Sequence, residues 1–212
     1  MNTSSTLRSA LQFAVALSAT ALAASAAPQS FDFKDPKGVN NVQFKLDAPL
    51  ESITGTATGI SGTVEFDPAT PGTVSGRIVL DTASLTVGNP LMGEHLHSAN
   101  WLDVAKHPTI TFEAVSAHNV RTQGATVTAD LTGRLTVKGI TRDVTVPVTF
   151  THLPDKLGAR LGNPELKGDL LVLRAAFTIN RTDFDIMAGQ MTDKVAESIA
   201  LSLSIAGAAP KA

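Results

Sequence analysis

The chain has 212 residues and a formal net charge of −2 at pH 7, and it contains no cysteine. A charge this small does not indicate binding to nucleic acid or to an anionic membrane surface. The lack of cysteine excludes disulfides, thiol catalysis, cysteine metal sites and covalently attached haem, so the fold must depend on a hydrophobic core.

The N-terminal segment predicts a secretory signal peptide. Arg8 precedes an apolar, alanine-rich run over Ser9–Ala24, and Ala24-Ser25-Ala26 has the small residues that a signal peptidase requires. The run is shorter than the stretch of about 20 apolar residues that crosses a bilayer, which favours cleavage over an uncleaved anchor. We predict a signal peptide over 1–26, a single domain over 27–212 and a periplasmic location.

The first part of the domain alternates apolar and polar residues, a pattern typical of half-buried antiparallel strands. Turn residues at Asp67-Pro68 and Pro71-Gly72 separate the alternating runs. The apolar positions of these strands are Val42, Phe44 and Leu46, then Val64 and Phe66, then Val74, Ile78 and Leu80.

One segment after residue 88 interrupts the alternation. Leu91–His97 has the length of a short helix, and Ser98 is a good N-cap for the turn that follows. Long connections in a chain of hairpins often form lids or site loops. We predict a short helical lid around 90–104 over one end of the fold. The residues expected to pack beneath it are Leu96, Trp101 and Leu102.

The alternation then returns and continues almost to the C-terminus. Its apolar positions are Ile110, Phe112 and Ala114; Val127, Ala129, Leu131, Leu135 and Val137; Val144, Val146, Val148 and Phe150; Leu171, Leu173, Ala175, Phe177 and Ile179; and Val195, Ile199, Leu201, Leu203 and Ile205. The terminal residues Ala208–Ala212 are expected to fray.

Eight or so such strands in one domain are typical of a β-sandwich or an up-and-down β-barrel. Glycines within or beside the strands, among them Gly62, Gly76 and Gly133, permit the bulges and sharp coiling by which a barrel closes. We therefore predict an all-β antiparallel barrel and keep the sandwich as the alternative.

The interior of such a barrel accommodates its own side chains or one small ligand. The inward-facing sets are aliphatic and phenylalanine, so a bound ligand should be apolar, and a barrel filled by side chains alone is the alternative. The predicted pore residues are Phe44, Phe66, Ile78, Leu80, Phe112, Leu131, Leu135, Val146, Val148, Phe150, Leu173, Phe177 and Ile179.

The chain offers no recognisable catalytic set. It has no Gly-x-Ser-x-Gly motif and no phosphate-binding glycine loop. The alternative to a binding protein is a metal-dependent or other enzyme that uses His95, His97 and His107, with Glu94 or Asp103 as an oxygen ligand. No spacing in this segment matches a zinc signature. We predict a protein that is not an enzyme and binds no metal.

Several motifs resemble those of the YceI-like proteins, in order and spacing, over roughly Phe31–Gly207. These motifs are His95-Leu96-His97-Ser98, Trp101-Leu102-Asp103-Val104, His107-Pro108-Thr109-Ile110-Thr111-Phe112, Leu135-Thr136-Val137-Lys138-Gly139-Ile140-Thr141 and Ile179-Asn180-Arg181-Thr182-Asp183-Phe184.

The resemblance implies a periplasmic, lipocalin-like antiparallel barrel of eight strands that holds a polyisoprenoid chain, such as a quinone or polyprenyl tail. It implies no cofactor beyond that bound isoprenoid lipid or quinone, and a membrane cytochrome as a partner. The residues that the resemblance assigns to the head group or lid are His95, Trp101 and Arg181.

Three positions depart from the family pattern. Asp47 or Ala48 stands where members often have a histidine, and Met92-Gly93-Glu94 replaces a common Arg-Asp. Asp185 replaces a glycine, so we expect a reshaped turn there, because aspartate tolerates positive φ less well than glycine does.

Overall fold

The structure is a computed structural model, and it describes residues 28–211. The predicted signal peptide over 1–26 lies outside the described residues. The strands are β1 (Gln29–Asp32), β2 (Asn41–Asp47), β3 (Ser52–Ala57), β4 (Ile60–Phe66), β5 (Ser75–Asp81), β6 (Thr86–Val87), β7 (Thr109–Gln123), β8 (Thr126–Val137), β9 (Ile140–Leu153), β10 (Gly168–Asn180) and β11 (Ser198–Pro210). The helices are α1 (Pro90–His97) and α2 (Leu157–Leu161), with the 3-10 helices η1 (Pro71–Thr73), η2 (Thr82–Ser84) and η3 (Arg181–Phe184). None of the helices between residues 28 and 211 has the length and hydrophobicity needed to span a lipid bilayer.

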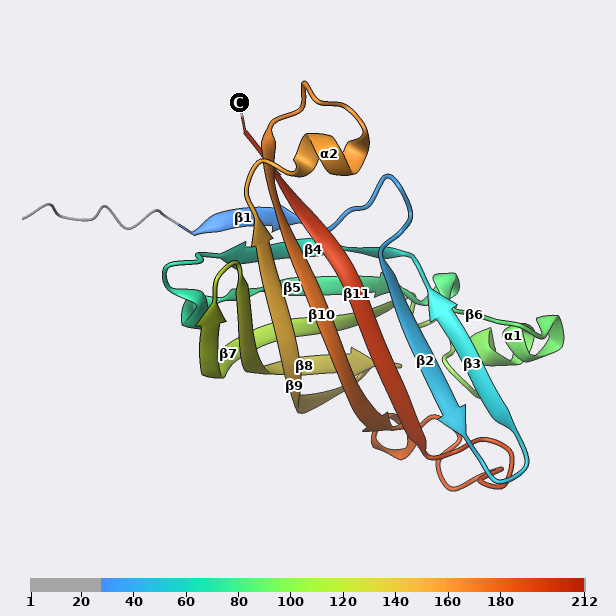
Figure 1. Cartoon of the computed structure of the whole chain (residues 1–212). Helices are drawn as coiled ribbons and strands as arrows, with labels where there is room; N and C mark the ends of the chain where they lie inside the picture. The colour runs from blue at the N-terminus through green and yellow to red at the C-terminus, as the bar shows by residue number, and fades with distance from the viewer. Residues whose placement is uncertain (1–27, 212) are drawn as a thin grey trace, which may run out of the picture.

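Eight strands close into an antiparallel barrel (Figure 1). The ring runs β1-β4-β5-β7-β8-β9-β10-β11 and returns to β1 through the pair Asp32 and Ala208. At the other end of β11, residues 200–204 pair with β2, and β2, β3 and β6 extend the sheet from there. The predicted eight-stranded barrel is confirmed, and the sandwich is wrong.

The buried side chain of Asn40 is hydrogen-bonded to β11 at the position where the strand beside β11 changes from β2 to β1. Asn40 is 2% exposed, and its Nδ2 donates to the carbonyl oxygens of Phe33 and Ala206, each at 3.1 Å. Its Oδ1 accepts from the backbone N–H of Ala206 at 2.9 Å. Because residues 33–40 leave the sheet here, the asparagine amide satisfies backbone groups that would otherwise be buried without a partner.

Phenylalanine rings lie over three glycines of the sheet. A Cβ on Gly133 would lie 2.4 Å from Cζ of Phe112 and 2.6 Å from the backbone oxygen of Glu113, so another residue fits there only if the ring and the backbone of β7 both shift. The register between β7 and β8 shifts just beyond the Ala114–Gly133 pair. The same arrangement occurs at Gly55 with Phe44 and at Gly207 with Phe33. At each of these positions an aromatic ring occupies the space that a side chain would need, so the position stays apolar.

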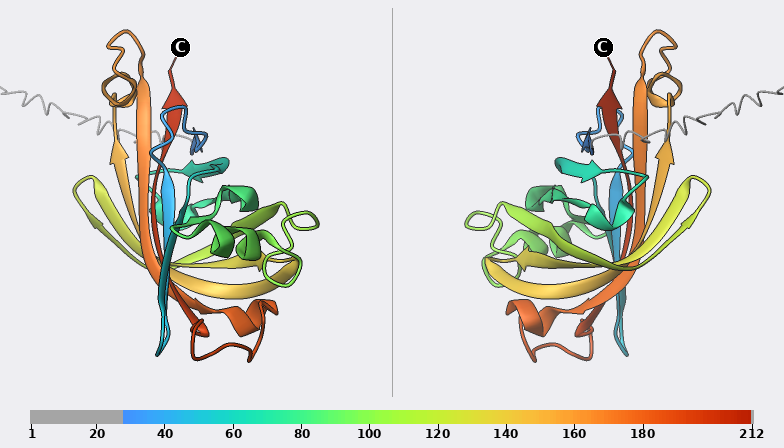
Figure 2. Two further views of the ribbon diagram at one scale, coloured as in Figure 1. Left: turned by 90° about the vertical axis from the view of Figure 1, so that its right-hand side faces the viewer. Right: turned by 90° about the vertical axis from the view of Figure 1, so that its left-hand side faces the viewer.

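The predicted lid helix is present, but its caps differ from the expectation. Asn89 is the N-cap of α1, and its side chain accepts from the backbone N–H of Met92 at 3.2 Å. Ser98 instead ends α1, where its Oγ donates to the carbonyl oxygen of His95 at 2.7 Å. Figure 2 shows α1 in green at one end of the barrel, with the strands curving behind it.

The C-terminal segment is ordered by ion pairs, which corrects the expectation of fraying as far as Lys211. Strand β11 extends to Pro210, and Nζ of Lys211 lies 2.7 Å from Oδ1 of Asp169 and 2.9 Å from Oδ1 of Asp155. Burial raises the pKa of Asp169, but hydrogen bonds from Lys211, the Asp155 backbone N–H and Gln29 lower it by more, so the net pKa lies below the ordinary value.

Gly133→Ala should lower the free energy of unfolding by about 1–3 kcal/mol, because the added methyl displaces the Phe112 ring. Urea titration of the purified variant measures this change. Gly93→Ala is the control, since nothing lies within 4 Å of a Cβ built there in α1. It should raise stability by about 0.5–1 kcal/mol, and equal effects of the two substitutions would contradict the steric account.

Asp169→Asn should lower the free energy of unfolding at pH 7 by about 1.5–3 kcal/mol, the contribution of hydrogen bonds to a charged group. A carboxyl whose folded pKa is depressed stabilises the fold above its unfolded pKa of about 4, and the stabilisation is lost as pH falls through the folded pKa. Urea unfolding between pH 7 and pH 3 should therefore show a smaller acid-dependent loss in Asp169→Asn than in the wild type. The exposed Glu165→Gln serves as control and should leave the acid-dependent loss unchanged.

Candidate functional site: an apolar cavity inside the barrel

A cavity of ≈ 540 Å³ occupies the interior of the barrel. Its wall is built from the inward-facing aliphatic and phenylalanine side chains of the strands, as the alternation predicts. Polar lining residues come from the segments around one end, which we call the mouth. They are Glu51, Asn89, His95, Arg181 and Lys194. The cavity therefore offers a long apolar wall and a small polar opening.

Most of the predicted pore residues line this cavity. Those that do are Phe44, Ile78, Leu80, Phe112, Leu131, Leu135, Val146, Val148, Phe150, Leu173 and Phe177.

Phe66 and Ile179 do not line the cavity, and their assignment to the pore is corrected. Phe66 is 1% exposed and stacks on Phe150 with ring centroids 5.4 Å apart. Its ring therefore lies behind a wall residue and fills the barrel beyond the cavity. Ile179 lies near the end of β10 and packs against the core while partly buried.

The alternation did not reveal the part of the wall that comes from the mouth. Lining residues on the segments without a two-residue period are Ile53, Leu85, Val87, Leu91, Met92, Ile186 and Met191. These lie in short strands, in the two-turn helix α1 and in loops, where apolar spacing does not report which face is buried. Only the closure of the barrel brings them to one opening.

Two of the predicted head-group residues border the mouth. His95 projects from α1 as an exposed side chain, and Trp101 is half-buried against the core; both line the cavity. Their polar ring nitrogens are the kind of group that orients a ligand in a mostly apolar pocket.

Arg181 is fully buried, and it holds its own chain rather than offering free donors to a ligand. A guanidinium has five N–H donors, and five backbone carbonyl oxygens accept from this one. The distances to those of Ile186, Gln190, Val195 and Ala196 are 3.0, 2.5, 3.0 and 3.1 Å, and the fifth acceptor is Met187. Oε1 of Glu197 lies 2.9 Å from Nη2 and completes the charge pair. The assignment of Arg181 to the head group is thereby corrected.

The carbonyls that Arg181 binds define the loop between β10 and β11, which forms one side of the mouth. Asp185, Met187 and Met191 adopt φ values of 51°, 46° and 54° there, a region that residues other than glycine rarely occupy. Such conformations persist only where the surroundings over-determine them. Val195, which the alternation assigned to the last strand, belongs to this loop because β11 begins at Ser198.

The three histidines considered as metal ligands are not brought together. Nε2 of His97 lies 2.8 Å from the carbonyl oxygen of Leu85, and the His107 ring packs beside Gly139, while His95 faces the mouth. Between residues 28 and 211, no group of three or more histidine or acidic side chains is placed to hold a metal ion. The geometry gives the metal alternative no support.

The residues that depart from the family pattern either lie outside the cavity wall or fit into it without disrupting it. Asp47 is exposed, and hydrogen bonds from Lys45 and Ser52 lower its pKa. Met92 adds an apolar side chain to the wall. Asp185 adopts the left-handed conformation that a glycine would take, and its carbonyl oxygen accepts from Nζ of Lys138 at 2.7 Å. The turn is therefore retained despite the substitution.

Arg181→Met should destabilise the protein by about 3–5 kcal/mol, because it leaves buried carbonyls and Glu197 without their partner. Thermal and urea unfolding measure the loss, and limited proteolysis should locate the first cleavages at residues 185–197. Arg142→Met is the control, since exposed Arg142 makes a single hydrogen bond, to the carbonyl oxygen of Asp183. An Arg181→Met protein as stable as this control would refute the structural role.

Comparisons with known proteins agree with this architecture. The UPF0312 protein of Ectopseudomonas mendocina is 33% identical over 155 residues, which are 73% of this chain and 74% of that protein. The UPF0312 protein of Pseudomonas syringae pv. syringae is 32% identical over 163 residues, 75% of each chain.

Two solved structures share the fold at low sequence identity. BcnA of Burkholderia cenocepacia superposes with a TM-score of 0.64 at 22% identity, covering 79% of this chain and 95% of that one. A protein from Saccharophagus degradans described as a polyisoprenoid binding domain has a TM-score of 0.60 at 11% identity, covering 86% and 99%. The sequence profile of the YceI-like domain matches residues 34–206, which includes nearly all of the barrel and both sides of the mouth. This protein therefore belongs to the YceI-like domain family.

Proposed function

We propose that the protein is an exported, periplasmic carrier without enzymatic activity that sequesters a polyisoprenoid or similar long apolar chain. The observation that carries the proposal is the cavity of ≈ 540 Å³, which is apolar along its length and polar only at the mouth. Its volume lies within the range of about 300–1,000 Å³ typical of small-molecule sites. An isoprenoid with a quinone or polyprenyl head would place its tail inside and its polar end at the mouth.

The energetics favour a chain rather than a compact ligand. Burial of one CH₂-sized group contributes about 0.8 kcal/mol, so one five-carbon isoprene unit contributes roughly 3–4 kcal/mol. Three or four enclosed units therefore offset an association cost of order 4–15 kcal/mol. Affinity then depends on the tail, and the choice among ligands with the same tail depends on the polar groups of the mouth.

Two further observations support the proposal. The structural neighbour from Saccharophagus degradans is described as a polyisoprenoid binding domain, and it shares this barrel. The signal-peptide pattern over 1–26 agrees with a site of action outside the cytoplasm.

Mass spectrometry of organic extracts is the direct test. The untagged protein would be purified from the periplasm without detergent, and a stoichiometric isoprenoid is the expected result. The spectrum would identify the tail length and the head group together. A folded protein whose extract is empty would contradict the proposal.

Phe112→Asp should abolish the bound lipid, because it places a carboxylate in the apolar wall, where an unpaired charge is strongly unfavourable. Val115→Asp is the matched control on the same strand, since Val115 is 59% exposed. Lipid content per mole of protein is the measured quantity. Unchanged lipid in Phe112→Asp would show that this side chain does not face the ligand.

Ala175→Phe separates loss of binding from loss of folding. Ala175 lines the cavity, and a phenyl ring there occupies ligand volume without adding charge. We expect a folded barrel by circular dichroism with a clearly reduced lipid content.

A further inference from the structure

Three large apolar side chains are left in water around the mouth. Leu50 is 68% exposed, Leu91 60% and Met191 48%. They come from the β2–β3 turn, from α1 and from the β10–β11 loop. We call Leu50, Leu91 and Met191 the rim.

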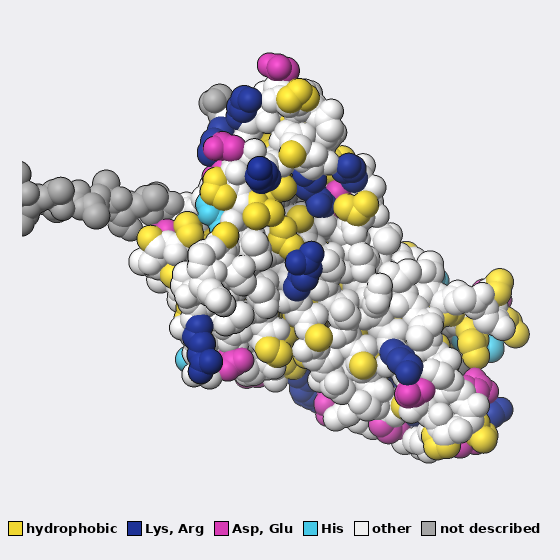
Figure 3. Space-filling model, in the orientation of Figure 1, with side chains coloured by type: hydrophobic (Ala, Val, Ile, Leu, Met, Phe, Trp, Pro, Cys, Tyr) yellow, Lys and Arg dark blue, Asp and Glu magenta, His cyan; other side chains and the backbone are white. Residues whose placement is uncertain are grey.

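The rim residues belong to one edge of the molecule. Leu91 and Met191 both line the cavity, so both border its opening. The backbone N–H of Leu50 donates to the carbonyl oxygen of Asp193 at 2.9 Å, which holds the β2–β3 turn beside the loop that carries Met191. Figure 3 shows hydrophobic side chains at this end, on the right, where α1 and the β2–β3 turn lie.

The loop part of the rim is held in place by the fold. Met191 has a φ of 54°, and its carbonyl oxygen accepts from the backbone N–H groups of Lys194 and Val195 at 3.0 and 2.7 Å. Arg181 binds the flanking carbonyls of Gln190 and Val195 from the buried side. A loop fixed on both sides keeps its methionine directed outward instead of folding it into the core.

We propose that the rim docks on the surface of a lipid bilayer, so that the mouth opens toward the membrane. This proposal rests on the carrier function, because an isoprenoid that leaves a bilayer would otherwise expose its whole tail to water. Burial of exposed apolar side chains at the bilayer surface is favourable in itself. When the rim is in contact with the bilayer, the isoprenoid tail passes directly from the bilayer interior into the apolar cavity.

The charged residues near the rim indicate which kind of lipid surface it would bind. Among the charged residues within five positions of a rim residue in the chain, acidic ones predominate: these are Asp47, Glu51, Glu94 and Asp193, against Lys45 and Lys194. Lys45 is already paired with Asp47 at 2.9 Å. An anionic bilayer would be repelled over distances of about a Debye length, so we assign the rim to a surface of zwitterionic lipid.

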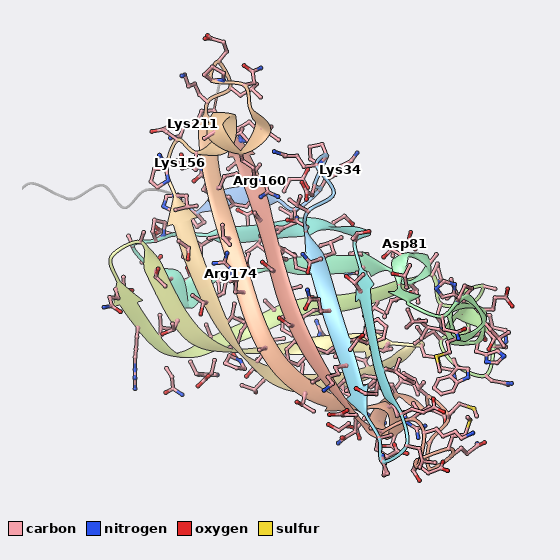
Figure 4. The ribbon with its side chains drawn as sticks, turned by 45° about the vertical axis from the view of Figure 1, so that its right-hand side comes forward. Lys34, Asp81, Lys156, Arg160, Arg174 and Lys211 are labelled. Carbon is pink, nitrogen blue, oxygen red and sulfur yellow. The ribbon has the colours of Figure 1, made fainter. Side chains whose placement is uncertain are left out.

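The opposite end of the barrel combines an exposed apolar side chain with charges of both signs. Lys34, Lys156, Arg160 and Lys211 lie around α2, as Figure 4 shows, and Leu166 is 41% exposed nearby. Arg160 there is paired with Asp35, and Lys211 is paired with Asp155 and Asp169, so the charges of this end are largely balanced. This end also lies away from the mouth. Comparison of the two ends therefore gives the experiment its control.

Flotation with phosphatidylcholine vesicles tests the proposal on the purified full-length protein. Leu50→Glu changes a rim residue that does not line the cavity, and Leu166→Glu makes the same change at the opposite end. We expect Leu50→Glu to weaken vesicle binding at least tenfold and Leu166→Glu to leave it within twofold of wild type. Leu50→Ser, which adds no charge, should weaken binding about threefold.

Three results would overturn the proposal. They are wild-type protein that does not bind the vesicles, equal losses in the two glutamate variants, and tighter wild-type binding when phosphatidylglycerol replaces part of the phosphatidylcholine. The last result would assign docking to a surface other than the acidic rim. The lipid content of the same samples separates membrane docking from the carrier function. Protein that carries an isoprenoid but does not bind vesicles contradicts only the proposal that the rim docks on a bilayer. Protein that binds vesicles but carries no isoprenoid contradicts the proposed carrier function.

Discussion

Closure of the sheet around β11 is the constraint on which the rest of the structure depends. This strand pairs with β10 along its whole length on one side, and on the other side with β2 and then with β1. Between those partners the chain leaves the sheet, and Asn40 supplies hydrogen bonds to Phe33 and Ala206 in place of the ladder. A closed ring of paired strands removes the unpaired edges of the sheet, so the interior can be almost entirely apolar.

The two ends of the barrel use that interior differently. At one end aromatic rings such as Phe66 and Phe150 stack and fill the space. At the other end the wall is completed by α1 and by the β10–β11 loop, which do not fill it, and the cavity opens between them. Protein interiors normally pack densely, so an unfilled apolar volume of this size is itself a sign of a ligand site.

Arg181 shows how a buried charge can support a binding site without contacting the ligand. Its guanidinium fixes five carbonyls of the loop that borders the mouth, and Glu197 balances its charge. The other polar side chains that line the cavity are those of Glu51, Asn89, His95 and Lys194. These four include both acidic and basic side chains, so the described mouth residues do not form a cluster of one charge.

The sequence predicted most of the strands, the barrel class, the lid helix and most of the apolar wall, because a side chain's face in a strand follows directly from its place in a two-residue period. It missed β1, β3 and β6, and the ring is closed by β1, whereas the predicted strand β2 lies outside it. Only the tertiary structure shows three further features. Phe66 and Ile179 lie away from the cavity, and the N–H groups of Arg181 already donate to backbone carbonyls. His95, His97 and His107 lie apart from one another. Periodicity indicates which side of a sheet a residue occupies, but how deep that residue lies inside the barrel depends on how the sheet closes. Likewise, the partner of a buried polar group is set by loops whose shape no local pattern specifies.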